Sequence, residues 1–333
     1  MNSISLQTEN LVIGYTKGKE STLVLEDINV SCGQSELICL MGGNGSGKST
    51  LLRTLSGLQN PLSGDVFIEK KNIDAYDPIG LSRKLSITLP TGTVTGNMNV
   101  KELVALGRYP YLDWKINFTR QDNDIVNRAL VMTNTEKIRD RMCHELSDGQ
   151  LQKVFIARAI AQDTPLMILD EPANHLDLNN RLEMMRLLTV LAKDHEKSII
   201  VSTHHLDLAL QLADKLWVIL PDGSLISGVP EDLCLNGTIE RAFPAKNYDI
   251  MTGKVQYEPT GKQVYLEEKE KIIWVKQALE RKGFITCDEK KAEVPIISPA
   301  MRSGKLHIEI TRGESVEVTD TIEEMLRLLI SGH

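Results

Sequence analysis

A glycine-rich run near the start of the chain has the residue types and spacing to bind phosphate. Gly42 is followed by four residues and then by Gly47, Lys48 and Ser49. Glycines let backbone N–H groups curl around phosphate oxygens, the lysine supplies a cation for the β- and γ-phosphates, and the hydroxyl supplies a ligand for Mg²⁺. A flexible Gly/Ser loop is the alternative interpretation. The residues of this predicted P-loop are Gly42, Asn44, Gly45, Ser46, Gly47, Lys48, Ser49 and Thr50.

Two adjacent carboxylates, Asp170 and Glu171, follow an apolar run at 166–169. Asp170, at the end of a buried strand, is expected to hold Mg²⁺ directly or through water. On an extended chain its neighbour points the other way, so Glu171 is expected to face the γ-phosphate and polarise an attacking water as general base. The alternative is a strand that simply ends in two solvated charges. Together with the P-loop, the pair predicts a site that hydrolyses a nucleoside triphosphate.

These motifs need a sheet and helices to bring them together. The P-loop lies between an apolar strand (36–41) and a helix-like segment (51–58), and strands alternate with helices further along. This order predicts an α/β fold with a P-loop NTPase core and a parallel sheet. Short β-rich runs before residue 30, broken by turn-formers such as Gly14, predict an N-terminal antiparallel flap. The expected strands are 4–6, 11–13, 22–25, 66–69, 85–89, 166–169 and 198–202, and the expected helices are 100–106, 121–134 and 181–193.

The composition of the chain changes after Pro244. Charged runs and two alternating segments, 307–311 and 315–319, precede a helix-like segment at 321–329. This pattern predicts a small C-terminal α+β domain. The expected domains are a nucleotide-binding domain at 1–244, with a helical subdomain at about 91–160, and an appendage of unassigned role at 245–333.

The overall composition is that of a folded globular protein. The 333 residues are 25% charged and carry a formal net charge of −7. The molecule as a whole therefore lacks the excess of positive charge that favours binding to nucleic acid or anionic lipid. No apolar run is long enough to cross a bilayer, which predicts a cytosolic chain. The cysteines include no Cys-x-x-Cys pair and are expected to be reduced, small core residues. They are Cys32, Cys39, Cys143, Cys234 and Cys287.

A third motif, Leu146-Ser147-Asp148-Gly149-Gln150, lies between the P-loop and the carboxylates. With it, the chain resembles the nucleotide-binding subunit of an ATP-binding cassette (ABC) transporter over about residues 4 to 240. The resemblance implies an ATPase that uses ATP and Mg²⁺. In this family the signature of one subunit caps the ATP held by the P-loop of another. A dimer of two copies is therefore expected, in which Ser147, Gly149 and Gln150 contact the partner's nucleotide.

Further positions match the family one by one. Tyr15 resembles the aromatic residue that stacks on adenine, although it could instead be a core tyrosine. Asp177 resembles the aspartate of the loop that touches the opposite subunit, with helix capping as the alternative. His204 resembles the switch histidine that contacts the γ-phosphate and the catalytic carboxylate, with an ordinary polar strand end as the alternative. The resemblance thus makes Glu171 and His204 the catalytic residues.

The sequence departs from the family pattern at three places. The glutamine that usually links the metal site to the membrane subunit is absent, and Pro90 or Thr91 falls nearest its place. Asp148 replaces the second glycine of the signature and adds an anion near phosphate, which repulsion opposes unless its side chain points away. His205 occupies a position where the family usually has aspartate, and no chemical role is predicted for it.

The segment 102–111 resembles the helical subdomain of importers for iron-siderophores, haem and cobalamin. The resemblance implies a peripheral subunit at the cytoplasmic face of the membrane that powers import. Its expected partners are a second copy, membrane permease subunits and, indirectly, a substrate-binding protein, but no nucleic acid. The alternative is a non-transport cassette that acts in DNA repair, on ribosomes or in Fe–S assembly. The sequence does not choose among the three cargoes.

Overall fold

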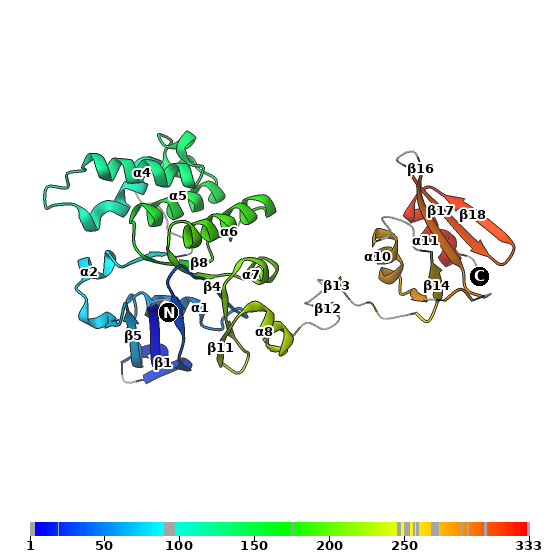
Figure 1. Ribbon diagram of the computed structural model, residues 1–333, viewed down its shortest axis with the longest axis horizontal. Coiled ribbons are helices and arrows are strands. Elements are labelled where there is room, and N and C mark those ends of the chain that lie inside the picture. Colours follow the sequence, from blue (N-terminus) through cyan, green and yellow to red (C-terminus); the bar gives the residue numbers. More distant parts are fainter. Residues whose placement is uncertain are drawn as a thin grey trace. The chain divides into compact units, whose positions relative to one another are not determined.

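The computed structural model divides the chain into two compact units, residues 1–244 and 245–333. The structure describes residues 4–18, 20–89, 97–174, 176–244, 248–249, 254–255, 257, 260–267, 273–287, 289–291, 293–302 and 305–331. Among these residues, no helix combines the length and the apolar character needed to cross a membrane. Figure 1 shows the chain coloured along its sequence.

A six-stranded sheet forms the centre of unit 1, with strand order β11-β10-β4-β9-β8-β7. All neighbouring pairs are parallel except β10 with β11. The apolar runs of β4, β8 and β9 are buried along their whole lengths, as expected for parallel strands covered on both faces. This confirms the expected α/β core. The strands are β4 (Leu37–Gly42), β7 (Leu85–Thr88), β8 (Leu166–Asp170), β9 (Ser198–Ser202), β10 (Lys215–Ile219) and β11 (Leu225–Gly228).

The N-terminal antiparallel flap is also present, but its first strand is longer than the sequence predicted. Gly14 does not break β1; it lies within the strand at a register shift against β2. A Cβ at Gly14 would lie 2.1 Å from the Thr22 carbonyl oxygen, so the glycine allows the two backbones to approach. The strands of this sheet are β1 (Ile4–Lys17), β2 (Glu20–Ile28), β3 (Ser31–Gly33), β5 (Ser63–Ile68) and β6 (Lys71–Asn72).

The helices of unit 1 include a separate cluster between β7 and β8. Its helices α3, α4 and α5 share a core of their own and lie at the end of unit 1 opposite β1 and β5 (Figure 1). Each begins with a reciprocal capping box, which satisfies its free N-terminal N–H groups. The helices are α1 (Lys48–Leu55), α2 (Pro78–Ser82), α3 (Val100–Ala105), α4 (Arg120–Met132), α5 (Asp148–Ala161), α6 (Leu178–Lys193), α7 (Leu206–Leu212), α8 (Pro230–Leu235) and α9 (Thr238–Ala242).

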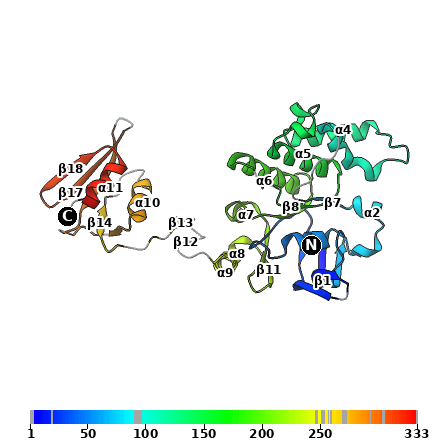
Figure 2. The same ribbon diagram turned by 180° about the vertical axis from the view of Figure 1, so that it is seen from behind.

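Unit 2 is an α+β domain built on a five-stranded sheet of order β15-β14-β16-β17-β18. Helices α10 (Ile273–Arg281) and α11 (Ile322–Ser331) lie beside this sheet (Figure 2), and apolar residues of both helices share one core with it. The sequence predicted β17, β18 and α11 but not β14, β15, β16 and α10. The elements are β12 (Tyr248–Asp249), β13 (Lys254–Val255), β14 (Gln263–Leu266), α10 (Ile273–Arg281), β15 (Ile285–Cys287), β16 (Ile296–Arg302), β17 (Lys305–Arg312), β18 (Ser315–Thr319) and α11 (Ile322–Ser331).

All five cysteines carry free thiols, as expected, but only three are buried. Cys32, Cys39 and Cys143 lie in the core, whereas Cys234 and Cys287 are partly exposed. Burial raises the pKa of Cys39 to about 12, which keeps this thiol protonated. The prediction that all five are core residues is therefore wrong for Cys234 and Cys287.

Candidate nucleotide site

The glycine-rich loop connects the end of β4 to the start of α1. Gly45 and Gly47 have φ angles of 75° and 100°, in the left-handed region that favours glycine. A Cβ at Gly47 would lie 2.6 Å from the Val24 side chain, so this position has no room for a larger residue. The loop directs the N-terminal end of α1 toward the space that it encloses. This is the geometry of an anion site made from backbone N–H groups.

Lys48 is a buried cation at the first position of α1. Its Nζ donates to the carbonyl oxygens of Gly42 and Gly43 at 2.9 Å each. Burial lowers the pKa of Lys48, and the nearby carboxylates of Glu171 and Asp170 oppose that shift. Asp170, at the end of the apolar strand, and Glu171, directly after it, therefore both lie near the P-loop.

A cleft of about 300 Å³ lies at the P-loop, with Tyr15 and Glu171 among its walls. Tyr15 is 51% exposed, so it is not a core tyrosine. Its hydroxyl hydrogen-bonds the Thr50 Oγ1 at 2.7 Å, which holds the ring beside the loop. The lining residues are Tyr15, Val24, Asn44, Gly45, Ser46, Gly47, Lys48, Ser49, Thr50 and Glu171. Val24 was not predicted, because nothing local to β2 marks this apolar residue as part of a site.

Asp170 offers a carboxylate oxygen of the kind that Mg²⁺ requires. The residue is 1% exposed, and its Oδ1 accepts a hydrogen bond from Ser202 Oγ at 2.5 Å. Its Oδ2 is buried and has no hydrogen-bond partner among the described residues. A buried anionic oxygen without a partner is costly, and a hard cation that prefers oxygen ligands would satisfy it. Asp170 therefore fits Mg²⁺, and Ser49 places a hydroxyl-bearing side chain in the lining of the P-loop cleft.

Glu171 reaches the site through a turn rather than along an extended strand. β8 ends at Asp170, and Glu171 has a φ of 49°, so the sequence expectation of an extended chain at this point is wrong. Its N–H donates to Ser202 Oγ at 2.8 Å, and its carboxylate accepts from Asn174 Nδ2 at 3.1 Å. The left-handed backbone, not strand alternation, turns the Glu171 carboxylate into the cleft.

Ser202 lies at the site, and sequence reasoning did not predict it. Its Oγ donates to Asp170 and accepts from the Glu171 N–H, so one hydroxyl orients both acidic residues. Ser202 ends β9 directly opposite Asp170 in the parallel register of β8 and β9. The only sequence signal was a polar residue at the end of a buried strand, and it becomes informative only once the strand pairing is known.

His204 lies beside the acidic residues, as expected. Its Nδ1 is 3.8 Å from Glu171 Oε1, and its side chain is 46% exposed. The ring of His205 packs against it with centroids 4.2 Å apart. Burial lowers the pKa of His205 to about 4, and the neighbouring His204 and Arg181 add to that shift. His205 is therefore neutral near pH 7 in the folded protein.

The low pKa of His205 predicts an acid-sensitive fold. Because the folded pKa of about 4 lies below the ordinary value of 6.5, the unfolded chain binds more protons between these values, and the free energy of unfolding falls as the pH falls through this window. We expect the urea midpoint of the wild-type protein to drop more between neutral pH and about pH 5 than that of His205→Gln. Equal drops in both proteins would contradict this assignment.

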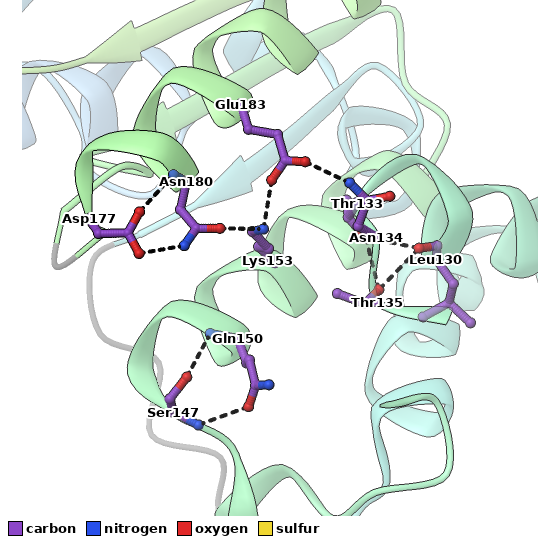
Figure 3. Close-up of polar contacts among 10 residues, drawn as sticks. All are labelled: Leu130, Thr133, Asn134, Thr135, Ser147, Gln150, Lys153, Asp177, Asn180 and Glu183. Carbon is purple, nitrogen blue, oxygen red and sulfur yellow. Dashed lines mark hydrogen bonds and ion pairs between the residues drawn. The ribbon is translucent and has the colours of Figure 1, made fainter. Parts of the chain in front are cut away.

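The signature residues line a second cleft, of about 360 Å³. Ser147 caps α5: its Oγ accepts from the Gln150 N–H, and the Gln150 side chain accepts from the Ser147 N–H (Figure 3). Asp148 occupies the first turn of α5, is exposed and does not line the cleft; the positive end of the helix favours an anion there. The lining residues are Asn134, Thr135, Ile138, Ser147, Gly149, Gln150, Lys153 and Asn180.

Asp177 is the N-cap of α6, the alternative role that its position allowed. Its Oδ1 accepts from the Asn180 N–H at 2.8 Å.

No residue is common to the linings of the first and second clefts. The structure thus brings Tyr15, the P-loop and Glu171 together, and it places Ser147, Gly149 and Gln150 in a different cleft. Pro90 and Thr91, the positions nearest the missing glutamine, lie outside the described residues.

Comparison with known proteins identifies the family. A family model described as ABC transporter matches residues 25–174, and one described as Iron ABC transporter C-terminal domain matches residues 261–330. An uncharacterised ABC transporter ATP-binding protein of Methanocaldococcus jannaschii is 35% identical over 73% of this chain and 82% of its own. The chain belongs to the ABC transporter ATP-binding proteins. This cassette is accordingly an ATPase that binds ATP, and the expected fold and enzyme class are confirmed.

Other relatives of the cassette have names that state a cargo. The achromobactin transport ATP-binding protein of Dickeya dadantii is 33% identical over 72% of this chain and 87% of its own. The ferric enterobactin transport ATP-binding protein of Escherichia coli is 32% identical over 72% of this chain and 86% of its own. A cobalamin import ATP-binding protein of Halobacterium salinarum is 32% identical over 74% of this chain and 63% of its own. The likeness to ATP-binding proteins of siderophore and cobalamin importers is thereby confirmed.

Solved structures of cassettes share the fold of unit 1. The dimeric structure of a bacterial ABC transporter cassette has a TM-score of 0.61 and 25% identity, over 68% of this chain and 98% of that one. The same cassette, as a dimer in a post-hydrolysis state bound to ADP and Pi, has a TM-score of 0.60 at the same identity and coverage. Cassettes of this fold therefore dimerise.

Proposed function

We propose that two copies of this cassette hold two ATP molecules between the P-loop cleft of one and the signature cleft of the other. The observation that carries the proposal is that the two clefts lie on one chain but share no lining residue. One copy therefore offers each ATP only a part of the predicted contacts. The dimeric relative supports this arrangement. In the proposed dimer, Ser147, Gly149 and Gln150 contact the partner's nucleotide, and Asp177 contacts the partner subunit.

Within one copy, each side chain has a separate task. Tyr15 stacks on adenine, the P-loop N–H groups and Lys48 hold the phosphates, and Asp170 and Ser49 hold Mg²⁺. When bound, the metal neutralises phosphate charge. Glu171 accepts the proton of the water that attacks the γ-phosphate, because its carboxylate faces the P-loop cleft.

His204 and Ser202 position the reacting groups. His204 Nδ1 lies 3.8 Å from Glu171 Oε1, so the imidazole stands directly beside the proposed general base. Ser202 holds the Glu171 backbone and the Asp170 carboxylate in register. Because these contacts are already formed, the general base needs little reorganisation when a nucleotide binds.

We further propose that the cassette powers import of an iron-siderophore through permease subunits, at the cytoplasmic face of the membrane and supplied by a substrate-binding protein. The support is the group of relatives named for achromobactin and ferric enterobactin, together with the match of unit 2 to an iron ABC transporter domain.

The cargo is tested by reconstituting the cassette with its co-purified membrane subunits and binding protein in vesicles. We expect a ferric siderophore, such as ferric enterobactin, to accelerate ATP hydrolysis, whereas the iron-free siderophore does not. Acceleration by haem or cobalamin instead would overturn the cargo assignment. Hydrolysis that never depends on membrane subunits would favour a non-transport cassette.

A further inference from the structure

A chain of polar contacts joins α5, α6 and the loop after α4 beside the signature cleft, and Lys153 is at its centre (Figure 3). The Lys153 Nζ donates to Asn180 Oδ1 at 2.7 Å and to Glu183 Oε2 at 2.9 Å. Lys153 lies on α5 one turn after Gly149, so it shares the face of the helix that carries the signature. Its side chain is only 16% exposed.

On one side, this chain of contacts ends at the carboxylate of Asp177. Asn180 donates its backbone N–H to Asp177 Oδ1 and its side-chain Nδ2 to Oδ2, both at 2.8 Å. These bonds lower the pKa of Asp177 and keep it ionised. The amide of Asn180 can satisfy both neighbours in one orientation only, because its oxygen must face the Lys153 ammonium and its NH₂ must face the carboxylate. Lys153 therefore fixes the rotamer that holds Asp177.

On the other side, the contacts reach the loop after α4. Glu183 Oε1 accepts from Asn134 Nδ2 at 2.8 Å, and the bond from Lys153 lowers the pKa of Glu183. Asn134 also lines the signature cleft. The Lys153 ammonium thus bonds two residues of α6, Asn180 and Glu183. Through Glu183 it also holds Asn134 in the wall of the signature cleft. Charge-assisted hydrogen bonds of this kind are stronger than neutral ones.

A packing contact also brings the two helix starts together. A Cβ at Gly149 would lie 3.0 Å from the Leu176 side chain, so the first turn of α5 approaches the residue before Asp177. Gly149 allows the two segments to pack closely, and the hydrogen bonds from Lys153 to Asn180 and Glu183 hold α5 against α6. The signature and Asp177 therefore lie close together although they start different helices.

We infer that Lys153 is a positioning residue: acting through Asn180, it aligns Asp177 with the signature so that both meet the partner copy together. The inference rests on the proposed dimer. It predicts that loss of Lys153 weakens closure of the dimer without weakening the binding of ATP to the P-loop of one copy.

The test compares Lys153→Met with Lys153→Arg in a Glu171→Gln background, where ATP is not consumed. We expect Lys153→Met to raise the ATP concentration for half-maximal dimerisation about tenfold by light scattering. Lys153→Arg should restore it to within about threefold, because it keeps the cation. The affinity of each monomer for a fluorescent ATP analogue should stay unchanged. Lys193→Met, which removes a lysine from the far end of α6, is the control.

An unchanged dimerisation midpoint in Lys153→Met, or an equal loss of analogue binding by the monomer, would overturn the inference. Hydrogen exchange of the Asn180 backbone N–H, measured in the monomer, tests the link from Lys153 to Asp177 independently of dimerisation. We expect faster exchange in Lys153→Met but not in Lys193→Met, and equal rates would overturn it. Should the Glu171→Gln parent itself fail to dimerise with ATP, the proposed function fails, and the exchange result alone decides the role of Lys153.

Discussion

Replacement of Lys48 by alanine is expected to weaken ATP binding by about 30-fold or more. Loss of one partner from a desolvated charge pair costs about 2 to 5 kcal/mol, which corresponds to this range. In the cassette, Lys48 is the buried cation that faces the site, and Asp170 and Glu171 lie close enough to affect its pKa. Without Lys48, a triphosphate would meet two carboxylates and no lysine. Isothermal titration with ATP in the presence of Mg²⁺ measures the loss.

The matched control is Lys193→Ala, which removes an exposed lysine paired with Asp214. We expect it to bind ATP like the wild-type protein. A thermal melt must show that Lys48→Ala remains folded, and we expect little loss of stability because burial disfavours the Lys48 charge. ATP binding within about threefold of wild type, by a folded Lys48→Ala protein, would exclude Lys48 from the phosphate site.

The parts of the fold that sequence could predict are those set by local patterns. The P-loop, the apolar run before Asp170 and the signature each combine a short motif with the element that must flank it. Buried parallel strands have continuous apolar runs, so β4, β8 and β9 were recognisable. In unit 2, by contrast, β14 and β15 are short and pair in parallel across α10, and no strict alternation marks them.

The details of the site that sequence could not predict depend on contacts between distant segments. The left-handed backbone of Glu171 is held by Ser202, which lies on the next strand of the sheet. The link from Asp177 to Lys153 passes through Asn180 and joins two helices. Spacing along a chain shows which residues share a helix face, but it does not show which faces meet. The motifs therefore located the chemistry, while strand pairing and helix packing determined how it is aligned.

Glu171→Gln is expected to lower steady-state ATP hydrolysis by about 100-fold or more while ATP binding is retained. A positioned general base contributes about 10² to 10⁴-fold to a rate, and glutamine is too weak a base to replace it. The amide keeps the size of the side chain, and its oxygen can still accept the hydrogen bond from Asn174. Loss of a negative charge beside the phosphates also favours the nucleotide-bound state. Phosphate release measures turnover, and light scattering with ATP measures the trapped dimer.

The control for this variant is Glu240→Gln, which removes a carboxylate from the exposed surface of α9. It makes the same chemical change away from the cleft, so we expect normal hydrolysis and no trapped dimer. Ser202→Ala distinguishes loss of the base from loss of its alignment. It keeps the Glu171 carboxylate but removes the hydroxyl that holds the Glu171 backbone and the Asp170 carboxylate. We expect Ser202→Ala to retain more activity than Glu171→Gln, because a misaligned base still accepts protons. Normal steady-state hydrolysis by Glu171→Gln would show that another group takes the proton, and the assignment of Glu171 as general base would then be wrong.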